Sequence, residues 1–243
     1  MAAGVRFARR GAVCLACKQV FGLFDLQVKT SKRGPRQLKR SKLERKGGEE
    51  EMSREDDLKL LKEFTKSENL IKHMLAVEAC MRAYAAKFGE DEEKWGTVGL
   101  LHDFDYERWP NIPDHPLKGA EILKERGYPD DVIYAIKSHA NLEEFPRVSL
   151  MDKALYACDE LAGFIVACAL VRPTRLEGLK AKSVRKKMKQ PSFAAAVNRD
   201  DIVKGAEELG VELNEHIDFC IAAMQKIADQ LGLTPPQGES QGE

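Results

Sequence analysis

Apolar side chains recur at steps of three and four residues along one stretch in the first half of the chain. They are Leu70, Met74, Val77, Met81, Tyr84 and Phe88. Because an α-helix completes a turn every ~3.6 residues, this spacing places all of them on one face. Gly89 follows directly and suits the left-handed conformation that ends many helices. The pattern therefore predicts a helix ending at Phe88 whose apolar face packs into a core.

The same spacing returns in later segments, which Gly, Pro, Asp or Asn residues separate. These segments cover about residues 92–102, 117–126, 130–140, 149–170, 178–189, 200–209 and 213–232. Ser53 precedes acidic residues and a further apolar pattern, which is typical of a helix start. No segment alternates apolar and polar residues as a strand does, so no significant sheet is predicted. We therefore expect an all-α fold, a bundle of about seven to nine helices.

The formal net charge is zero, with 39 basic and 39 acidic residues, but the charges are unevenly distributed. Residues 1–51 hold 13 Lys and Arg against 5 Asp and Glu, a net charge of +8, which leaves residues 52–243 at −8. Clustered cations supply most of the free energy of phosphate-backbone binding, so this acidic part argues against a nucleic-acid partner. We expect a basic, disordered extension (1–51), a helical domain (52–233) and a disordered tail (234–243).

The first 24 residues contain Arg6, Arg9, Arg10 and Lys18 and no acidic residue, a composition typical of a mitochondrial transit peptide. A start-like sequence at Met52 leaves a second interpretation open, in which residues 1–51 are not expressed. The longest apolar run, residues 161–171, is shorter than the roughly 20 residues that a bilayer requires, so no membrane association is expected. We predict a cytoplasmic protein, with a mitochondrial location as the alternative.

The chain has six cysteines, and four of them lie in apolar helical surroundings. These four are Cys80, Cys158, Cys168 and Cys220. We expect them to be reduced thiols in the core, because no secretory signal indicates an oxidising compartment. The remaining two, Cys14 and Cys17, form a CxxC pair without the second pair or the nearby histidines that a zinc site needs.

Four of the five histidines fall within 67 residues, from His73 to His139. Asp103 follows His102 at the point where an apolar helix ends and a polar loop begins. Asp159 lies in an otherwise apolar helical segment, where a buried carboxylate costs on the order of several kcal/mol unless a cation or a metal pairs with it. Each histidine alone is compatible with a packed core residue, but together with these carboxylates they predict a metal site.

The order of His73, the His102-Asp103 pair and Asp159 on successive helices resembles the HD superfamily of metal-dependent phosphohydrolases. The segments DHPLKGAEIL and AIKSHAN, which contain further histidines, are similar to the five-motif HDIG-type subset that binds two metals. This likeness covers about residues 65–170. Residues 170–232 resemble the end of a bacterial branch of predicted HD hydrolases.

The resemblance implies a ligand set for two metals. The first metal would be held by His73, His102, Asp103 and Asp159, and the second by Asp103, His115 and His139. Such imidazole and carboxylate ligands suit one or two divalent transition ions, namely Mn²⁺, Fe²⁺, Co²⁺ or Zn²⁺. The chain departs from the HD-GYP phosphodiesterases, which have HDIGK and paired histidines, because it has HDFDY at 102–106 and Ala140 after His139.

We expect a metal-activated water to attack a nucleotide or another small phosphate ester. Asp103 and Asp105 are the candidate catalytic residues, and Asp105 is either a general acid or base or a partner of a metal ligand. Lys118, Arg172 and Arg175 are the candidate residues for binding the substrate phosphate.

Two other functions remain open at this point. Some HD proteins, including myo-inositol oxygenase, hold a mixed-valent pair of irons with the same ligand order and activate oxygen. A non-catalytic helical binding module is the second alternative, in which the basic run at 172–187 docks an acidic partner. That basic run is also compatible with a helix face that is exposed to solvent and has no partner.

Overall fold

The computed structural model describes residues 52–236, and within this range the chain forms ten α-helices and no β-strand. The helices are α2 (Arg54–Phe64), α3 (Glu68–Phe88), α4 (Glu92–Leu101), α5 (Asp114–Glu125), α6 (Asp130–Ser138), α7 (Leu150–Leu170), α8 (Ala181–Met188), α9 (Arg199–Leu209), α10 (Leu213–Gln225) and α11 (Ala228–Leu231). The predicted all-α fold is confirmed. The expectations for residues 1–51, including the transit peptide and the CxxC pair, and for residues 237–243 lie outside the described residues.

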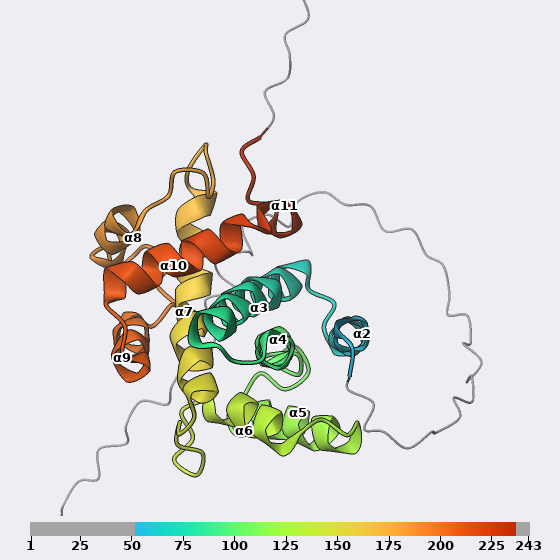
Figure 1. The fold of residues 1–243 in the computed structure, drawn as a ribbon. Coiled ribbons are helices and arrows are strands. Elements are labelled where there is room, and N and C mark those ends of the chain that lie inside the picture. Colours follow the sequence, from blue (N-terminus) through green and yellow to red (C-terminus); the bar gives the residue numbers. More distant parts are fainter. Residues whose placement is uncertain (1–51, 237–243) are drawn as a thin grey trace, which may run out of the picture.

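Helix α7 runs through the centre of the fold, and several of the other helices are arranged along its length (Figure 1). α6 and α5 lie towards its N-terminal end, α8 and α9 lie to one side, and α3 and α10 pack against its middle. Of its 21 residues, 17 are buried, because the sequence of this helix is apolar on nearly every face. The central position of α7 therefore follows from its composition.

The helix ends follow local sequence signals. Ser53, Ser67 and Ser149 accept hydrogen bonds from backbone N–H groups at the starts of α2, α3 and α7. Gly89 and Gly210 close α3 and α9 in the left-handed conformation, each with φ of 75°. These residues fix where the long helices begin and end.

The structure differs from the sequence expectation at the C-terminal end of the fold. The segment 213–232, expected as one helix, is divided into α10 and α11 at Ile227, whose φ of −124° and ψ of 23° are not helical. The break turns the chain so that Leu231 and Leu233 enter the core, where both are buried. Burial of these two side chains gives a physical reason for the turn, and the break accounts for the tenth helix.

Helices α3 and α4 approach each other closely at Gly99. A Cβ atom on Gly99 would lie 2.8 Å from the Cα atom of Glu78, which belongs to the backbone of α3. Backbone atoms cannot move aside as a flexible side chain can, so the contact requires a residue without Cβ. The contact brings two histidines towards each other, because α3 carries His73 and α4 ends directly before His102.

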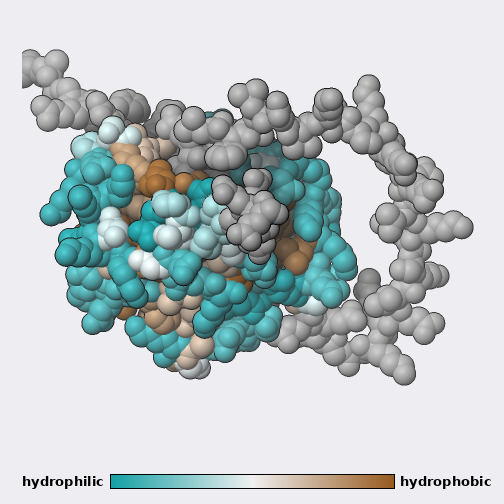
Figure 2. Space-filling view, turned by 90° about the horizontal axis from the view of Figure 1, so that it is seen from above, coloured by the Kyte–Doolittle hydropathy of each residue, from teal (hydrophilic) through white to brown (hydrophobic). Residues whose placement is uncertain are grey.

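The face of the molecule that Figure 2 shows is mostly hydrophilic. Figure 2 shows one face, on which small hydrophobic areas lie among hydrophilic residues. Large apolar side chains that are more than a third exposed, among residues 52–236, are Ile112, Val148, Leu150 and Val171. None of the helices in this range combines the length and the apolar content that crossing a bilayer would require.

The close approach of α3 and α4 predicts that Gly99→Ala lowers the free energy of unfolding by about 1–3 kcal/mol, the usual cost of overpacking. Gly96→Ala is the matched control on the same helix, because the three atoms nearest to its added Cβ all belong to the guanidinium of Arg82, the end of a long side chain. Both changes gain the same helix propensity. Urea denaturation of the two variants measures the difference, and equal stabilities would contradict the close-packing argument.

Candidate metal centre

The structure brings all six predicted metal ligands together in the interior. They come from five parts of the fold: α3, the residues that follow α4, the start of α5, the residue that follows α6, and the middle of α7. None of them is more than 6% exposed. The residues are His73, His102, Asp103, His115, His139 and Asp159. Segments up to 86 positions apart in the sequence therefore meet at one point.

One group of ligands consists of His73, His102 and Asp159. The Nε2 atom of His73 lies 3.0 Å from Oδ1 of Asp159, and Nε2 of His102 lies 3.5 Å from the same oxygen. One potential ligand atom from each residue lies within 4.8 Å of the others, which is close enough for a single ion to contact all three. The two rings meet edge to face, with centroids 5.2 Å apart.

The second group consists of Asp103, His115 and His139. Oδ1 of Asp103 lies 3.2 Å from Nε2 of His115 and 3.3 Å from Nε2 of His139. The other oxygen, Oδ2, lies 3.6 Å from Nε2 of His102, a member of the first group. The two oxygens of Asp103 therefore face different groups, which is the arrangement that a carboxylate needs to bridge two ions.

The orientation of three imidazoles is fixed by hydrogen bonds at Nδ1. His102 donates to the carbonyl of Gly99 at 2.9 Å, and His139 donates to the carbonyl of Ile136 at 2.5 Å. Because a carbonyl only accepts, Nδ1 carries the proton and Nε2 presents its lone pair to the centre. Metal-binding histidines are commonly held in this way.

The third of these imidazoles, His115, depends on Asp105. Its Nδ1 donates to Oδ1 of Asp105 at 2.7 Å, and the backbone N–H of Gly119 donates to Oδ2 at 2.9 Å. A Cβ atom on Gly119 would lie 2.7 Å from the Asp105 carboxylate, so the close approach needs a glycine. Sequence analysis did not single out Gly119. Its only signal was a small residue one turn after His115 in the DHPLKGAEIL segment.

The charged residues of the centre indicate that it binds a cation. Burial alone would raise the pKa of Asp103, but the imidazoles of His102, His115 and His139 hold that pKa well below its usual range. Burial would also lower the pKa of His115, yet its two carboxylate neighbours raise that pKa to about 10. Without a metal, the two carboxylates beside His115 would therefore retain a proton on its imidazole.

Unpaired polar atoms also fit an ion at this point. Nε2 of His102 and both carboxylate oxygens of Asp103 are buried and have no hydrogen-bond partner among the described residues. Buried polar atoms normally find a partner, and exceptions need an explanation. A bound divalent ion supplies one, because imidazole nitrogens and carboxylate oxygens are suitable ligands for transition metals. The residues present therefore fit one or two such ions.

The predicted phosphate-binding residues contact groups close to them in the sequence. Lys118 is on α5 with its side chain 45% exposed, and its ammonium lies 3.2 Å from Glu121. Arg172 and Arg175 lie past the end of α7, and the helix rises by about 16 Å between Asp159 and Leu170. The Arg172 guanidinium donates to the carbonyls of Arg175 and Glu177 and shapes the local turn.

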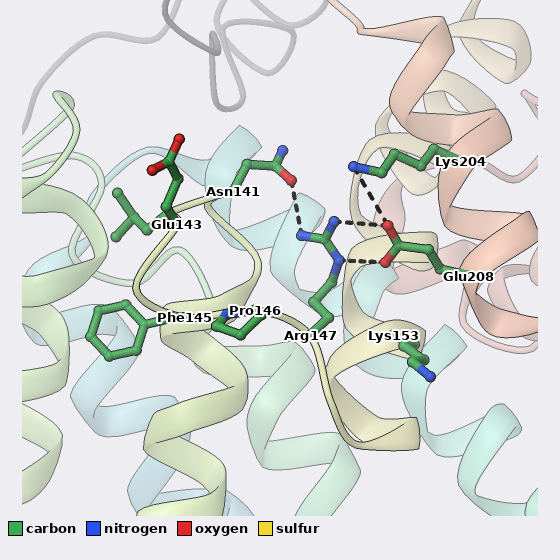
Figure 3. Close-up of a pocket in the computed structure, with 9 residues that line it drawn as sticks. Asn141, Glu143, Phe145, Pro146, Arg147, Lys153, Lys204 and Glu208 are labelled. Atoms are coloured by element: carbon green, nitrogen blue, oxygen red, sulfur yellow. Dashed lines mark hydrogen bonds and ion pairs between the residues drawn. The ribbon is translucent and has the colours of Figure 1, made fainter.

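An open groove of about 430 Å³ begins two residues after His139 and lies between the α6–α7 loop and α9 (Figure 3). Arg147 crosses it and donates to both carboxylate oxygens of Glu208, at 2.7 and 3.0 Å. Lys153 and Lys204 also line the groove. Sequence analysis missed these residues, because contacts between α9 and the α6–α7 loop have no local signal.

Comparison with known proteins finds one family and several relatives that resemble part of the chain. The HD domain family matches residues 70–163, a range that contains all six ligands. Ribonuclease Y of Oleidesulfovibrio alaskensis is 32% identical over 98 residues, and Ribonuclease Y of Nitratidesulfovibrio vulgaris strain DP4 is 34% identical over 98 residues. Ribonuclease Y of Desulfotalea psychrophila is 32% identical over 97 residues.

Each of these matches covers 40% of this chain but only 18% of the relative, so the chain spans less than a fifth of the length of the proteins that it resembles. No solved structure matches the chain. The family match and the convergence of its histidines and aspartates agree on one assignment. Residues 70–163 of this chain are similar to the HD domain family.

Proposed function

We propose that this protein is a hydrolase that cleaves a phosphate ester of a small molecule, such as a nucleotide, with one or two divalent transition ions. The observation that carries the proposal is the position of Asp103, whose two buried oxygens face two separate groups of ligands. A carboxylate in this position joins the two groups into one centre. The similarity of residues 70–163 to the HD domain family supports the hydrolytic class of the reaction.

The six ligands divide into two sets under this proposal. His73, His102, Asp103 and Asp159 would hold the first ion, and Asp103, His115 and His139 would hold the second. When bound, Mn²⁺, Fe²⁺, Co²⁺ or Zn²⁺ would supply a Lewis acid for the phosphoryl oxygen and lower the pKa of water to about 7. Burial of the ligands excludes bulk water from the centre and strengthens their electrostatic interactions.

Asp105 has a positioning role in this mechanism. Its carboxylate is 1% exposed and is occupied by His115 and Gly119, so it has no open side towards a substrate. We therefore assign it to holding the His115 ring, one of the two roles that the sequence suggested, rather than to proton transfer. Asp103 acts through the ions that it would bridge.

The identity of the Lys and Arg residues that bind the substrate phosphate remains a prediction. Lys118 is exposed and close in sequence to His115, so it would have to leave Glu121 in order to meet a phosphate. Arg172 and Arg175 are engaged in the turn after α7 and are not supported by their positions. We add Lys153 and Lys204 as candidates, because they line the groove whose first residue, Asn141, follows His139 by two positions.

RNA is a second candidate substrate, favoured by two observations. The similar proteins are named Ribonuclease Y. The chain also carries eight Lys or Arg residues between positions 172 and 189, with Glu177 as the only acidic residue among them. Against this, the remainder of residues 52–243 is strongly acidic, which weakens attraction for a polyanion. We therefore place the small phosphate ester first.

Metal content and phosphate release test the proposal together. The full chain, purified in Mn²⁺, is expected to retain one or two ions and to release phosphate from members of a panel of nucleotides and phosphomonoesters. Asp103→Ala is expected to lose both ions and the activity, because both groups lose a ligand. Asp130→Ala, which alters an exposed aspartate on α6, is the matched control and should leave both unchanged.

Three results of that measurement would contradict the proposal. Cleavage of an RNA oligonucleotide without release from the small-molecule panel would transfer the assignment to RNA. Two irons with oxygen uptake and no phosphate release would indicate an oxygenase. Full metal retention by Asp103→Ala would show that the ligand set is wrong.

The position of Asp105 generates a separate prediction. Asp105→Asn replaces the carboxylate acceptor beside His115 with a weaker, neutral one, so affinity for the second ion should fall by about 10–100-fold while the first ion is retained. Titration of the metal-free variant with Mn²⁺ measures both affinities. A general-acid or general-base role would instead lower the maximal rate and alter its pH profile without changing metal affinity.

A further inference from the structure

Three cysteine side chains from three helices meet in the core away from the ligands of the HD centre. Cys80 is on α3, Cys158 on α7 and Cys220 on α10, and all are fully buried. Their sulfur atoms lie within 4.8 Å of one another, and all three are free thiols. Cys158 and Asp159 are neighbours on α7, where successive side chains point about 100° apart, so this helix presents one residue to each centre.

An imidazole lies beside this group, next to Cys220. His216 precedes Cys220 by one helical turn on α10, and its Nδ1 lies 3.7 Å from Sγ of Cys220. In tetrahedral zinc sites, Zn–S bonds of about 2.3 Å and Zn–N bonds of about 2.0–2.1 Å place a sulfur and a nitrogen ligand about 3.6 Å apart. The distance between these two atoms therefore already suits shared coordination.

The His216 ring is held in the orientation that a ligand needs. Its Nε2 donates to the carbonyl of Ala157 at 2.9 Å, so the proton is on Nε2 and Nδ1 presents a lone pair towards the thiols. The hydroxyl of Tyr84 now donates to that nitrogen at 2.6 Å. Coordination would replace this one hydrogen bond and leave a hydroxyl donor beside the sulfur atoms.

Buried cysteines are often no more than small apolar side chains, and that explanation accounts for Cys168, which lies outside the group. It does not account for three thiols that meet within 4.8 Å of one another with an oriented imidazole nitrogen 3.7 Å from one of them. This is the donor set of a Cys₃His structural zinc site.

We propose that Cys80, Cys158, Cys220 and His216 form a second metal site that binds Zn²⁺ or a similar thiophilic ion with a structural role. Binding would release the three thiol protons to solvent and would change no oxidation state. The ion would join α10, which lies outside the HD match, to α3 and α7, the helices that carry His73 and Asp159.

Cobalt spectroscopy tests this proposal, because a sulfur-to-cobalt charge-transfer band requires thiolate ligands and the HD centre has none. The full chain carries Cys14→Ser and Cys17→Ser throughout, which removes the other cysteine pair. It is unfolded, refolded anaerobically with reductant and excess Co²⁺, and freed of unbound ion, since a buried site fills as the chain folds.

The proposal predicts a charge-transfer band that corresponds to one Co²⁺ per chain and disappears on addition of an equivalent of Zn²⁺ during refolding. The band should persist in Asp103→Ala, whose HD centre is disabled, and in Cys168→Ser, the matched buried control. It should be lost in Cys220→Ala and reduced or shifted in His216→Gln.

A count of four reactive thiols in denaturant would show that the remaining cysteines are reduced. Absence of the band from such a refolded parent protein would overturn the proposal and show that the three thiols are only apolar core side chains. This result does not depend on the folding of any cluster variant. Loss of the band in Asp103→Ala with retention in Cys220→Ala would overturn it as well. Neither result bears on the HD hydrolase assignment, which rests on separate residues.

Discussion

The arrangement of the helices depends on two carboxylates, Asp103 and Asp159, that are buried among four imidazoles. A buried carboxylate needs hydrogen-bond donors or positive charge close to it, and at these two residues the imidazoles or bound ions must supply them. The ligands come from five separate segments, so each segment has to reach the centre within a fraction of an ångström. The close contacts at Gly99 and Gly119 are consequences of this requirement, because each brings one ligand-bearing segment nearer to the next.

Helix ends provide the means of holding the ligands. The last carbonyls of a helix have no partner within the helix, and they need a donor from elsewhere. α4 and α6 each end one residue before a histidine, and in both cases Nδ1 of that histidine donates to the carbonyl three residues earlier. One hydrogen bond thus satisfies an unpaired carbonyl and turns Nε2 towards the centre. The same local geometry at His102 and His139 explains why two ligands directly follow helices.

The fold class and the ligands could be predicted from the sequence because both have local signals. Helical periodicity marks α3 and α7, and a charged residue such as Asp159 is conspicuous in an apolar helix. The partner of Asp105 could not be predicted, since it depends on how α5 packs. The thiol group was equally hidden: Cys80 and Cys220 are 140 positions apart, and each alone has the pattern of an ordinary core residue. The turn at Ile227 could not be predicted either, because it depends on where Leu231 packs in the core.

The family match ends at residue 163, inside α7, yet the physical unit extends further. α7 is buried on nearly all faces, and helices α2 to α6 lie along only part of its surface. The rest is covered by C-terminal helices, and a Cβ atom on Gly205 of α9 would lie 2.7 Å from the Cα atom of Ala157. Without α8 to α10, α7 would expose apolar surface on the side opposite its metal ligand. The helix that carries Asp159 therefore depends for its packing on residues outside the HD match, although the carboxylate itself faces ligands inside that match.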